Sequence, residues 1–335
     1  MKSNGRNMRL FIFGSLLLTV ILDSRTAVNA TLQGLELCIK TVIPGIFPIL
    51  YLSSAISNEL KSFSVPHLEH LLRMPAGTAG YFIIGLLCGY PVGAKLLQSA
   101  ADRGDIDRST AARMISFCNN ASPAFIVGIL SSLFSSGWIA IIMWLIQIIA
   151  SFLVGSIIPG AGTAHKLAEH PHDSSLGKTM LESLKATAVI CGWIILFGVF
   201  LSYIQIPIIH RLGNISNAMI SGLLELTNGI HALGEIRSDA IRFTMAAVLL
   251  SFGGVCVILQ TKSVAPILKI KPYLLSKLLH GGISGFLAST IGLLIFPEDH
   301  SCLSCVPLFF SVSVIIILIF RYNKKISSIQ PKTIV

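Results

Sequence analysis

Charged residues are scarce in this chain. Of its 335 residues only 12% are Asp, Glu, Lys or Arg, whereas 53% are hydrophobic, and the mean hydropathy is +0.78. Soluble globular domains carry about 25% charged residues. The shortage of charge therefore indicates an all-α polytopic membrane protein, whose short loops leave no room for a separate soluble domain.

The sequence also lacks the patterns of enzyme active sites. It contains no HExxH helix, no phosphate-binding glycine loop and no arrangement typical of a hydrolase triad. Carboxylates at membrane depth are too few for a metal-dependent enzyme, so we expect no enzyme activity, no metal and no cofactor. The net charge of +10 follows the loops and forms no single basic face, which argues against nucleic-acid binding.

Cysteine is present but carries little information. Five of the seven cysteines lie in apolar runs, where cysteine behaves as a small hydrophobic residue. Cys302 and Cys305 form a CxxC in the polar loop "PEDHSCLSC". Because no second pair accompanies them, a metal site is weakly supported, and a disulfide and two plain thiols both remain open.

Apolar runs long enough for a bilayer, which needs about 20 residues, predict eight crossings. The predicted spans are 9–22, 35–56, 114–133, 138–158, 184–206, 242–260, 279–297 and 304–321. Residues 1–34 are an N-terminal helix or signal anchor: "VNA", residues 28–30, resembles a signal-peptidase site, but we favour retention of the helix. Either alternative leaves the remaining topology unchanged.

Two further apolar stretches are too short to cross. Residues 76–88 stop at Gly89-Tyr90-Pro91, and residues 215–226 stop at Thr227-Asn228-Gly229. Irregular backbone at membrane depth survives only against protein or a wet cavity, so we predict re-entrant hairpins over 76–101 and 215–234.

Positive charge supports this topology. With both termini in the cytoplasm, the inner side holds 19 of the 25 Lys and Arg residues, as the positive-inside rule requires. This count places Lys262, Lys269, Lys271 and Lys277 together on one inner loop. If either hairpin crossed completely, every later loop would change sides and the bias would be lost.

The two hairpin regions resemble each other. "GLLCGYP" followed by "SFCNNASPAFIVGIL" matches "GLLELTNG" followed by "SFGGVCVILQ", at nearly equal spacing. Three crossings lie between them, so the second unit is inverted, as in secondary transporters whose substrate binds where broken helices meet. The predicted units are a repeat over 35–158 with a broken helix at 114–133, a linker at 159–183, a repeat over 184–300 with a broken helix at 242–260, and a last helix and basic tail at 301–335.

Five motifs carry a family resemblance: "GYPVGAKLL", "RMISFCNNASPAFIVG", "LLELTNGI", "SFGGVCVILQ" and "KLLHGGISG". Over residues 35–320 the chain resembles the YlbJ-type (stage V sporulation protein V-like) sporulation integral membrane proteins of the nucleoside-recognition gate-domain group. The resemblance implies a fold like that of concentrative nucleoside transporters. It also implies transport of dipicolinic acid from the mother cell across the outer forespore membrane of a sporulating bacterium. The chain has a short 160–183 loop and a short tail for that family.

The breaks supply the candidate substrate-binding residues. In the first repeat these are Gly89, Tyr90, Pro91, Lys95, Asn119, Asn120 and Ser122, and in the second they are Glu225, Thr227, Asn228, Gly253, Gly254 and Gln260. We expect the tip of each hairpin to meet the unwound helix at the centre of the molecule, which brings Tyr90, Lys95 and Asn119 close to Glu225 and Gly253.

Each polar candidate has a structural alternative. Lys95 faces a cavity or a partner, unless it extends to the inner surface, because a charge near the bilayer centre costs about 2.5–3.5 kcal/mol. Asn119 and Asn120 either line the site from an unwound segment or bridge helices. Glu225 either titrates or releases a cation during transport, or it only pairs with Lys95. His280 is expected to pack at a helix crossing.

Transport of a small solute is the function that these features favour. A dianionic aromatic such as dipicolinate suits Lys95, Tyr90 and half-helix N-termini, whereas a nucleoside would use the Asn, Gln and Glu side chains. A gate or scaffold subunit of a spore-envelope complex is a further alternative. The expected partners are a small-molecule substrate and the lipid bilayer, with no nucleic acid, and a second copy of the chain remains an open alternative.

Overall fold

The computed structural model describes residues 2–57, 63–158, 160, 176–205, 213–303 and 305–329. Within these ranges the chain forms helices and no strand, which confirms the predicted all-α class. The helices are α1 (Lys2–Leu22), α2 (Ser24–Leu37), α3 (Ile43–Ala55), α4 (Pro66–Leu71), α5 (Ala79–Cys88), α6 (Val92–Asp102), α7 (Arg108–Cys118), α8 (Pro123–Leu130), α9 (Gly137–Ile157), α10 (Leu176–Gln205), α11 (Gly213–Leu224), α12 (Leu226–Leu233), α13 (Asp239–Phe252), α14 (Gly254–Val264), α15 (Ile270–Ile295) and α16 (Cys305–Ile329).

Five helical stretches are long and apolar enough to cross a bilayer, judged by length and composition. They are Ser24–Ala55, Gly137–Ile157, Leu176–Ile204, Asp239–Val264 and Ile270–Ile295. Each overlaps a predicted span. A membrane-embedded helical protein in contact with lipid is therefore confirmed, while the number of crossings and the side on which the termini lie remain predictions.

The three other predicted spans fall on shorter or interrupted helices. Two coincide with shorter apolar helices, Phe13–Leu22 and Cys305–Leu318. The third, 114–133, is not one continuous helix, because α7 ends at Cys118 and α8 begins only at Pro123. Most of the 159–183 linker and the side chain of Cys302 lie outside the described residues.

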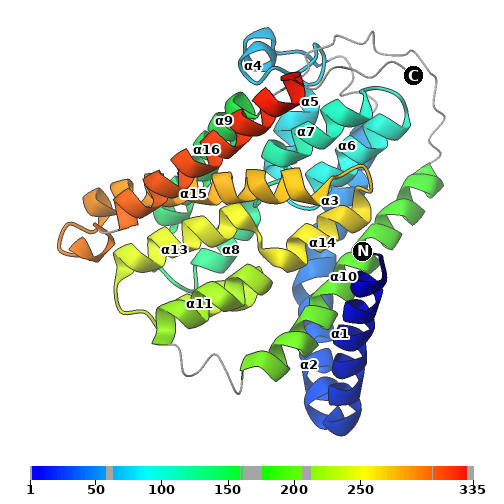
Figure 1. Cartoon of the computed structure of the whole chain (residues 1–335), viewed down its shortest axis with the longest axis vertical. Coiled ribbons are helices and arrows are strands. Elements are labelled where there is room, and N and C mark those ends of the chain that lie inside the picture. The colour runs from blue at the N-terminus through cyan, green and yellow to red at the C-terminus, as the bar shows by residue number, and fades with distance from the viewer. Residues whose placement is uncertain are drawn as a thin grey trace.

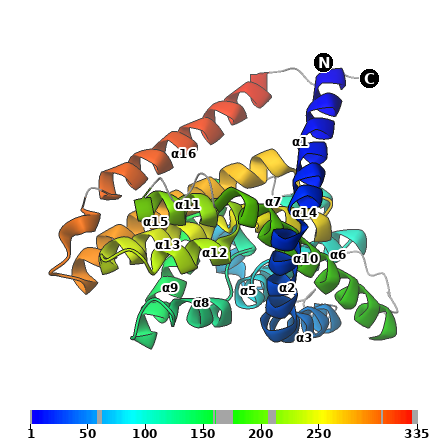
Figure 2. The ribbon, with the colours of Figure 1, turned by 90° about the horizontal axis from the view of Figure 1, so that it is seen from below.

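The N-terminal helices form a group with α10. The segment α2–α3 runs on through a π-helical turn (Cys38–Val42) and packs against α10. Figure 1 shows α1, α2 and α10 side by side at one end of the molecule, and Figure 2 shows α1 standing out from the other helices. Apolar side chains from the π-helical turn, α3 and α10, among them Cys38, Leu50 and Ile190, form a small buried cluster there.

A helical hairpin followed by a broken pair of helices occurs twice, and the two copies are called the first and the second repeat below; their inverted relation in the membrane remains a prediction. The first consists of the hairpin α5–α6 and the broken pair α7–α8, and the second of α11–α12 and α13–α14. The four hairpin helices have 8 to 12 residues each. At a rise of 1.5 Å per residue, none can cross a hydrocarbon layer of about 30 Å by itself.

Three of the four breaks lie where the sequence predicted them. Gly89 and Gly253 have positive φ values of 76° and 84° and end α5 and α13. Residues 119–122 form no helix. The fourth break is a correction: α11 ends before Glu225, and Thr227 and Asn228 already belong to the first turn of α12.

Two carboxylates outside the broken segments hold helix N-termini. Glu69, which is buried, accepts hydrogen bonds from Thr78 N and Ala79 N at the start of α5, each at 3.0 Å. Asp299, in the loop after α15, accepts from Ser238 Oγ at 2.7 Å and from Ala240 N at 3.1 Å at the start of α13. Hydrogen bonds from residues 301, 238 and 240 hold the pKa of Asp299 well below its usual range.

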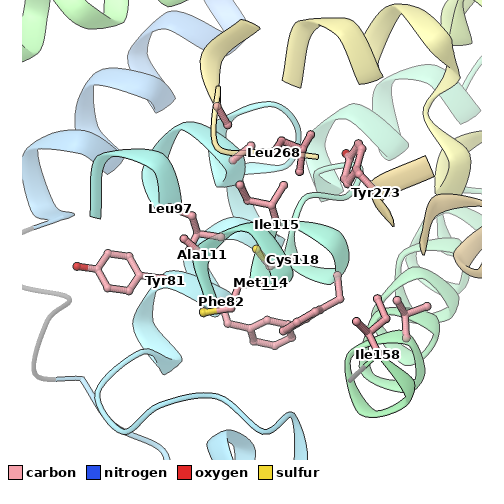
Figure 3. Close-up of a cluster of buried hydrophobic side chains, with 14 of the residues drawn as sticks. Tyr81, Phe82, Leu97, Ala111, Met114, Ile115, Cys118, Ile158, Leu268 and Tyr273 are labelled. Atoms are coloured by element: carbon pink, nitrogen blue, oxygen red, sulfur yellow. The ribbon is translucent and has the colours of Figure 1, made fainter. Parts of the chain in front are cut away.

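The long helix α15 lies along the centre of the molecule and packs against α7, α9, α13 and α16 (Figure 1). Apolar side chains from both repeats meet beside it. In Figure 3, Tyr273 at the start of α15 and Leu268 join the same cluster as Leu97, Ile115 and Cys118 of the first repeat. The two repeats therefore share one core.

Candidate functional site

A cavity of about 440 Å³ lies between the two repeats and the α2–α3 and α10 helices. Small-molecule sites are concave, mostly apolar and typically 300–1,000 Å³ in volume, with a few placed polar groups. Apolar side chains supply most of the lining here, including Ile46, Phe125, Ile194 and Val257. Five of the predicted site residues line the same cavity: Tyr90, Ser122, Glu225, Thr227 and Gln260.

The N-terminal ends of two half-helices border this cavity. Ser122 caps α8, and its hydroxyl accepts a hydrogen bond from Phe125 N at 3.2 Å. Glu225 caps α12, and its carboxylate accepts from Thr227 N at 3.1 Å and from Asn228 N at 2.9 Å. Helix N-termini present free amides and a partial positive charge, which suits anionic groups. At α12 the carboxylate of Glu225 already occupies this position and accepts hydrogen bonds from two of the free amides.

Tyr90 is the polar group of the first hairpin that reaches the cavity. Its phenol oxygen is buried without a hydrogen-bond partner among the described residues. The ring packs edge-on to Phe125 at a centroid distance of 6.2 Å. A Cβ on Gly253 would come within 3.9 Å of this ring, so the tip of the first hairpin meets the break of the second broken helix.

The amide of Gln260 is the remaining polar group of the second repeat at the cavity. The side chain is buried, and its nitrogen lies 3.2 Å from Cys256 Sγ, one helical turn earlier in α14. Sulfur is a weak acceptor, so most of the hydrogen-bonding capacity of this amide is left for a bound molecule.

Asn119 and Asn120 lie behind the cavity and do not line it. Asn119 is fully buried, and its side-chain nitrogen donates to Tyr273 OH at 2.9 Å and to Thr261 Oγ1 at 3.2 Å. The carbonyl of Asn120 accepts from Tyr90 N at 2.7 Å. Of the two alternatives, the bridging of helices describes these contacts. The Asn119 carboxamide ties the unwound segment to the second repeat, and the backbone carbonyl of Asn120 ties it to the first hairpin.

Lys277 is the residue that the charge count misplaced. It does not lie on an inner loop but in α15, where it is 1% exposed. Its ammonium group donates to the carbonyl oxygen of Asn119 and, at 3.0 Å, to Oδ1 of Asn120. A signal was available in the sequence, since Tyr273, Lys277 and His280 are spaced for one helical face. The signal was missed because the predicted span began at residue 279, which left Lys277 on the preceding loop.

Lys95 faces a partner that the sequence did not identify. Its ammonium lies 3.3 Å from a carboxylate oxygen of Glu182 on α10, and its side chain is 20% exposed. It neither lines the cavity nor pairs with Glu225. The ion pair with Lys95, which was one of the two alternatives for Glu225, therefore does not form: Lys95 points toward α10.

Glycines allow the broken pieces to approach closely. A Cβ on Gly89 would come within 2.6 Å of Ser122 N, and one on Gly254 within 2.9 Å of Gly222 O. In the first repeat the hairpin tip thus contacts the break of the broken helix. In the second repeat the break of the broken helix contacts the hairpin. Gly89, Pro91, Gly253 and Gly254 shape the breaks without lining the cavity, and Asn228, in the first turn of α12, does not line it either.

A second buried polar group lies on α9, α13 and α15. Gln147 of α9 donates to Ala247 O at 3.2 Å and accepts from Ser251 Oγ at 3.0 Å. The Nε2 atom of His280 lies 3.2 Å from Gln147 O, and the residue is fully buried. His280 therefore packs at a helix crossing, as the sequence predicted. Gln147 carried no motif that could have identified it.

Comparison with known proteins gives one similarity over most of the chain. The chain is 23% identical over 314 residues to the sporulation integral membrane protein YlbJ of Bacillus subtilis (strain 168), covering 78% of this chain and 77% of that protein. No family model matches the chain, and no solved structure matches it. The resemblance to YlbJ-type sporulation integral membrane proteins, inferred from the five motifs, is thereby confirmed.

Proposed function

We propose that this chain is a membrane transporter of a small solute, and that the solute binds in the cavity between the two repeats. One observation carries the proposal. Half-helix ends from both units, with Tyr90, Ser122, Glu225, Thr227 and Gln260, converge on a single cavity of about 440 Å³. In secondary transporters built from repeats, the substrate site lies at such a meeting of broken helices.

Dipicolinate is the substrate that the family resemblance favours. The similar Bacillus subtilis protein is described as a sporulation integral membrane protein, and we extend that role to this chain. The cytoplasmic termini, the location in the outer forespore membrane and the transfer of dipicolinate from the mother cell all belong to this proposal. At the site, the N-terminal end of α8 beside Ser122 offers its amide dipoles to a carboxylate.

A neutral polar ring, such as a nucleoside, is the second candidate. The cavity lining favours it, because the described residues that line it include the carboxylate of Glu225 and no Lys or Arg side chain. Glu225, Gln260 and the phenol of Tyr90 could accept and donate hydrogen bonds to ring and hydroxyl groups. A carboxylate facing a dianion would instead repel it unless the carboxylate were protonated.

Uptake by purified protein in liposomes tests the proposal and separates the two solutes. We expect labelled dipicolinate or uridine to enter proteoliposomes faster than protein-free liposomes. Glu225→Gln should reduce uridine uptake, because an acceptor is lost, and should leave or raise dipicolinate uptake, because a repulsive charge is lost. Glu235→Gln, an exposed acid just beyond α12, is the matched control and should change neither.

Two results would contradict the proposal. Entry of neither solute above the protein-free level, by protein that is folded and inserted, would leave the scaffold alternative in its place. Equal loss of activity in the Glu225 and Glu235 variants would remove the cavity from the mechanism even if transport were observed.

A further inference from the structure

The ammonium group of Lys277 is buried at the centre of the molecule. It donates to the carbonyl oxygen of Asn119 and to Oδ1 of Asn120, and its nitrogen lies 5.6 Å from the centroid of the Tyr273 ring. Two oxygens and an aromatic face thus surround the charge. Such contacts are typical of a bound cation, because oxygen lone pairs and the negative face of a ring both attract positive charge.

The charge has no acidic partner within the described ranges: no Asp or Glu oxygen there lies within 4.0 Å of the ammonium. A buried charge without a counter-ion costs several kcal/mol. A methionine of similar length would fill the same space without that cost. The retained charge therefore needs a reason beyond packing.

The oxygens that Lys277 holds belong to the break between α7 and α8. The carbonyl of Asn119 is free because α7 ends at Cys118, and its neighbour Asn120 donates through its side chain to Phe117 O at 2.8 Å. Asn120 O in turn holds the first hairpin through Tyr90 N. The ammonium consequently fixes the unwound segment against which the cavity residue Tyr90 rests.

In transporters with broken helices, unwound backbone carbonyls coordinate the coupling cation. We propose that the ammonium of Lys277 takes the place of that cation at the first break, so that transport is coupled to a proton carried by Lys277 and requires no sodium. This proposal rests on the proposed transport function. Deprotonation converts the ammonium to a neutral amine and releases one proton to water, and the weakened contact frees Asn119 O and Asn120 Oδ1.

The titratable surroundings of Lys277 come from few elements. Cys118 of α7 and His280 of α15 interact with it electrostatically, and Tyr273 of α15 presents its ring. No residue of α9 is titratable.

The remaining neighbouring helices carry their charges elsewhere. Asp239 and Arg242 pair with each other at the start of α13, and Lys262 of α14 donates to the carbonyls of Pro266 and Leu268. Cys256 of α14 and Cys305 of α16 are the other titratable residues on the described side chains of these helices. Among the described residues, no nearby carboxylate would therefore hold the proton on Lys277.

Chemical replacement of the ammonium tests the cation site without transport. Lys277→Ala removes the ammonium and leaves the oxygens and a space beside them. We expect methylammonium chloride to raise the thermal midpoint of this variant in detergent by about 2 °C or more, with no comparable rise for wild type. N-methylglucamine chloride, which is too large for the space, and Lys262→Ala, on a neighbouring surface, are the controls. No rise, or an equal rise in all proteins, would overturn the assignment.

The driving force tests the coupling and uses the unaltered protein, so it remains decisive if Lys277→Ala does not fold. In wild-type proteoliposomes a pH gradient should drive uptake in sodium-free buffer, and a protonophore should abolish it. Lys277→Arg, which keeps the charge but does not release its proton, should lose gradient-driven accumulation. Uptake driven by a sodium gradient alone would overturn the proposal. Absence of uptake under every gradient would refute the transport function and the coupling with it, whereas the methylammonium result would stand separately.

Discussion

The close contact between α11 and α12 in the second hairpin can be tested with a single methyl group. Gly229 of α12 lies against Gly222 of α11, and a Cβ added at Gly229 would come within 2.1 Å of Gly222 Cα and 2.5 Å of Gly222 N. Ordinary van der Waals contact begins at 3.4 Å. Because the obstructing atoms are backbone, no side chain can rotate away, and α11 and α12 would have to separate by more than one ångström.

The cost of Gly229→Ala follows from that separation. Overpacking a close contact typically costs about 1–3 kcal/mol, and this one lies at the upper end because two helices must move. We expect the thermal midpoint to fall by about 6 °C or more. The first hairpin provides a graded comparison: a Cβ on Gly93 would stand 3.1 Å from Gly85 Cα, so Gly93→Ala should cost less.

Gly192→Ala is the matched control, since nothing lies within 4 Å of a Cβ at that position of α10. Alanine is a better helix former than glycine by about 0.5–1 kcal/mol, so this variant should be as stable as wild type or slightly more stable. Thermal unfolding in detergent, followed by intrinsic fluorescence and by loss of the monodisperse peak, measures all three. Equal midpoints for Gly229→Ala and Gly192→Ala would refute the described contact between α11 and α12.

Two further predictions concern the loops and the topology. Since folding lowers the pKa of Asp299, its ionised form stabilises the fold at neutral pH, and this contribution is lost as the pH falls below about 4. Asp299→Asn should therefore lower the thermal midpoint at pH 7, with a difference from wild type that narrows toward acid, while Glu298→Gln should change little; a pH-independent difference would contradict this. In a cysteine-free background, cysteines at Phe63 and Ser109, which flank the first hairpin, should both react with a membrane-impermeant reagent from the cytoplasmic side. Labelling from opposite sides would mean that the hairpin crosses.

The helix breaks could be predicted because their causes are local. Glycine with positive φ and proline at a helix start act through the backbone of one or two residues, so Gly89, Pro123 and Gly253 mark their breaks in the sequence itself. The break at Glu225 was misplaced because glutamate is not a preferred N-cap residue, and the Thr-Asn-Gly that follows it resembles a turn. Only the hydrogen bonds to Thr227 N and Asn228 N identify the cap.

The partners of the charged residues could not be predicted because they depend on distant segments. Lys95 meets Glu182, and Lys277 meets Asn119, across 87 and 158 residues of sequence. A hydropathy window treats a lysine near the end of an apolar run as a loop residue, although a buried oxygen-lined place can hold it. The residues that line the cavity could not be predicted for the same reason, since Tyr90 and Glu225 reach it from different repeats.

The reactivity of one native cysteine tests the central claim most directly. Cys88 ends α5 and lines the cavity between the repeats. In protein that retains Cys88 as its single cysteine, we expect the transported solute to slow alkylation of Cys88 in a concentration-dependent way, because the bound solute covers it. A cysteine placed instead at Leu303, on the exposed loop before α16, should react at the same rate with or without the solute. Unchanged alkylation of Cys88 at solute concentrations that saturate uptake would contradict a substrate site in this cavity.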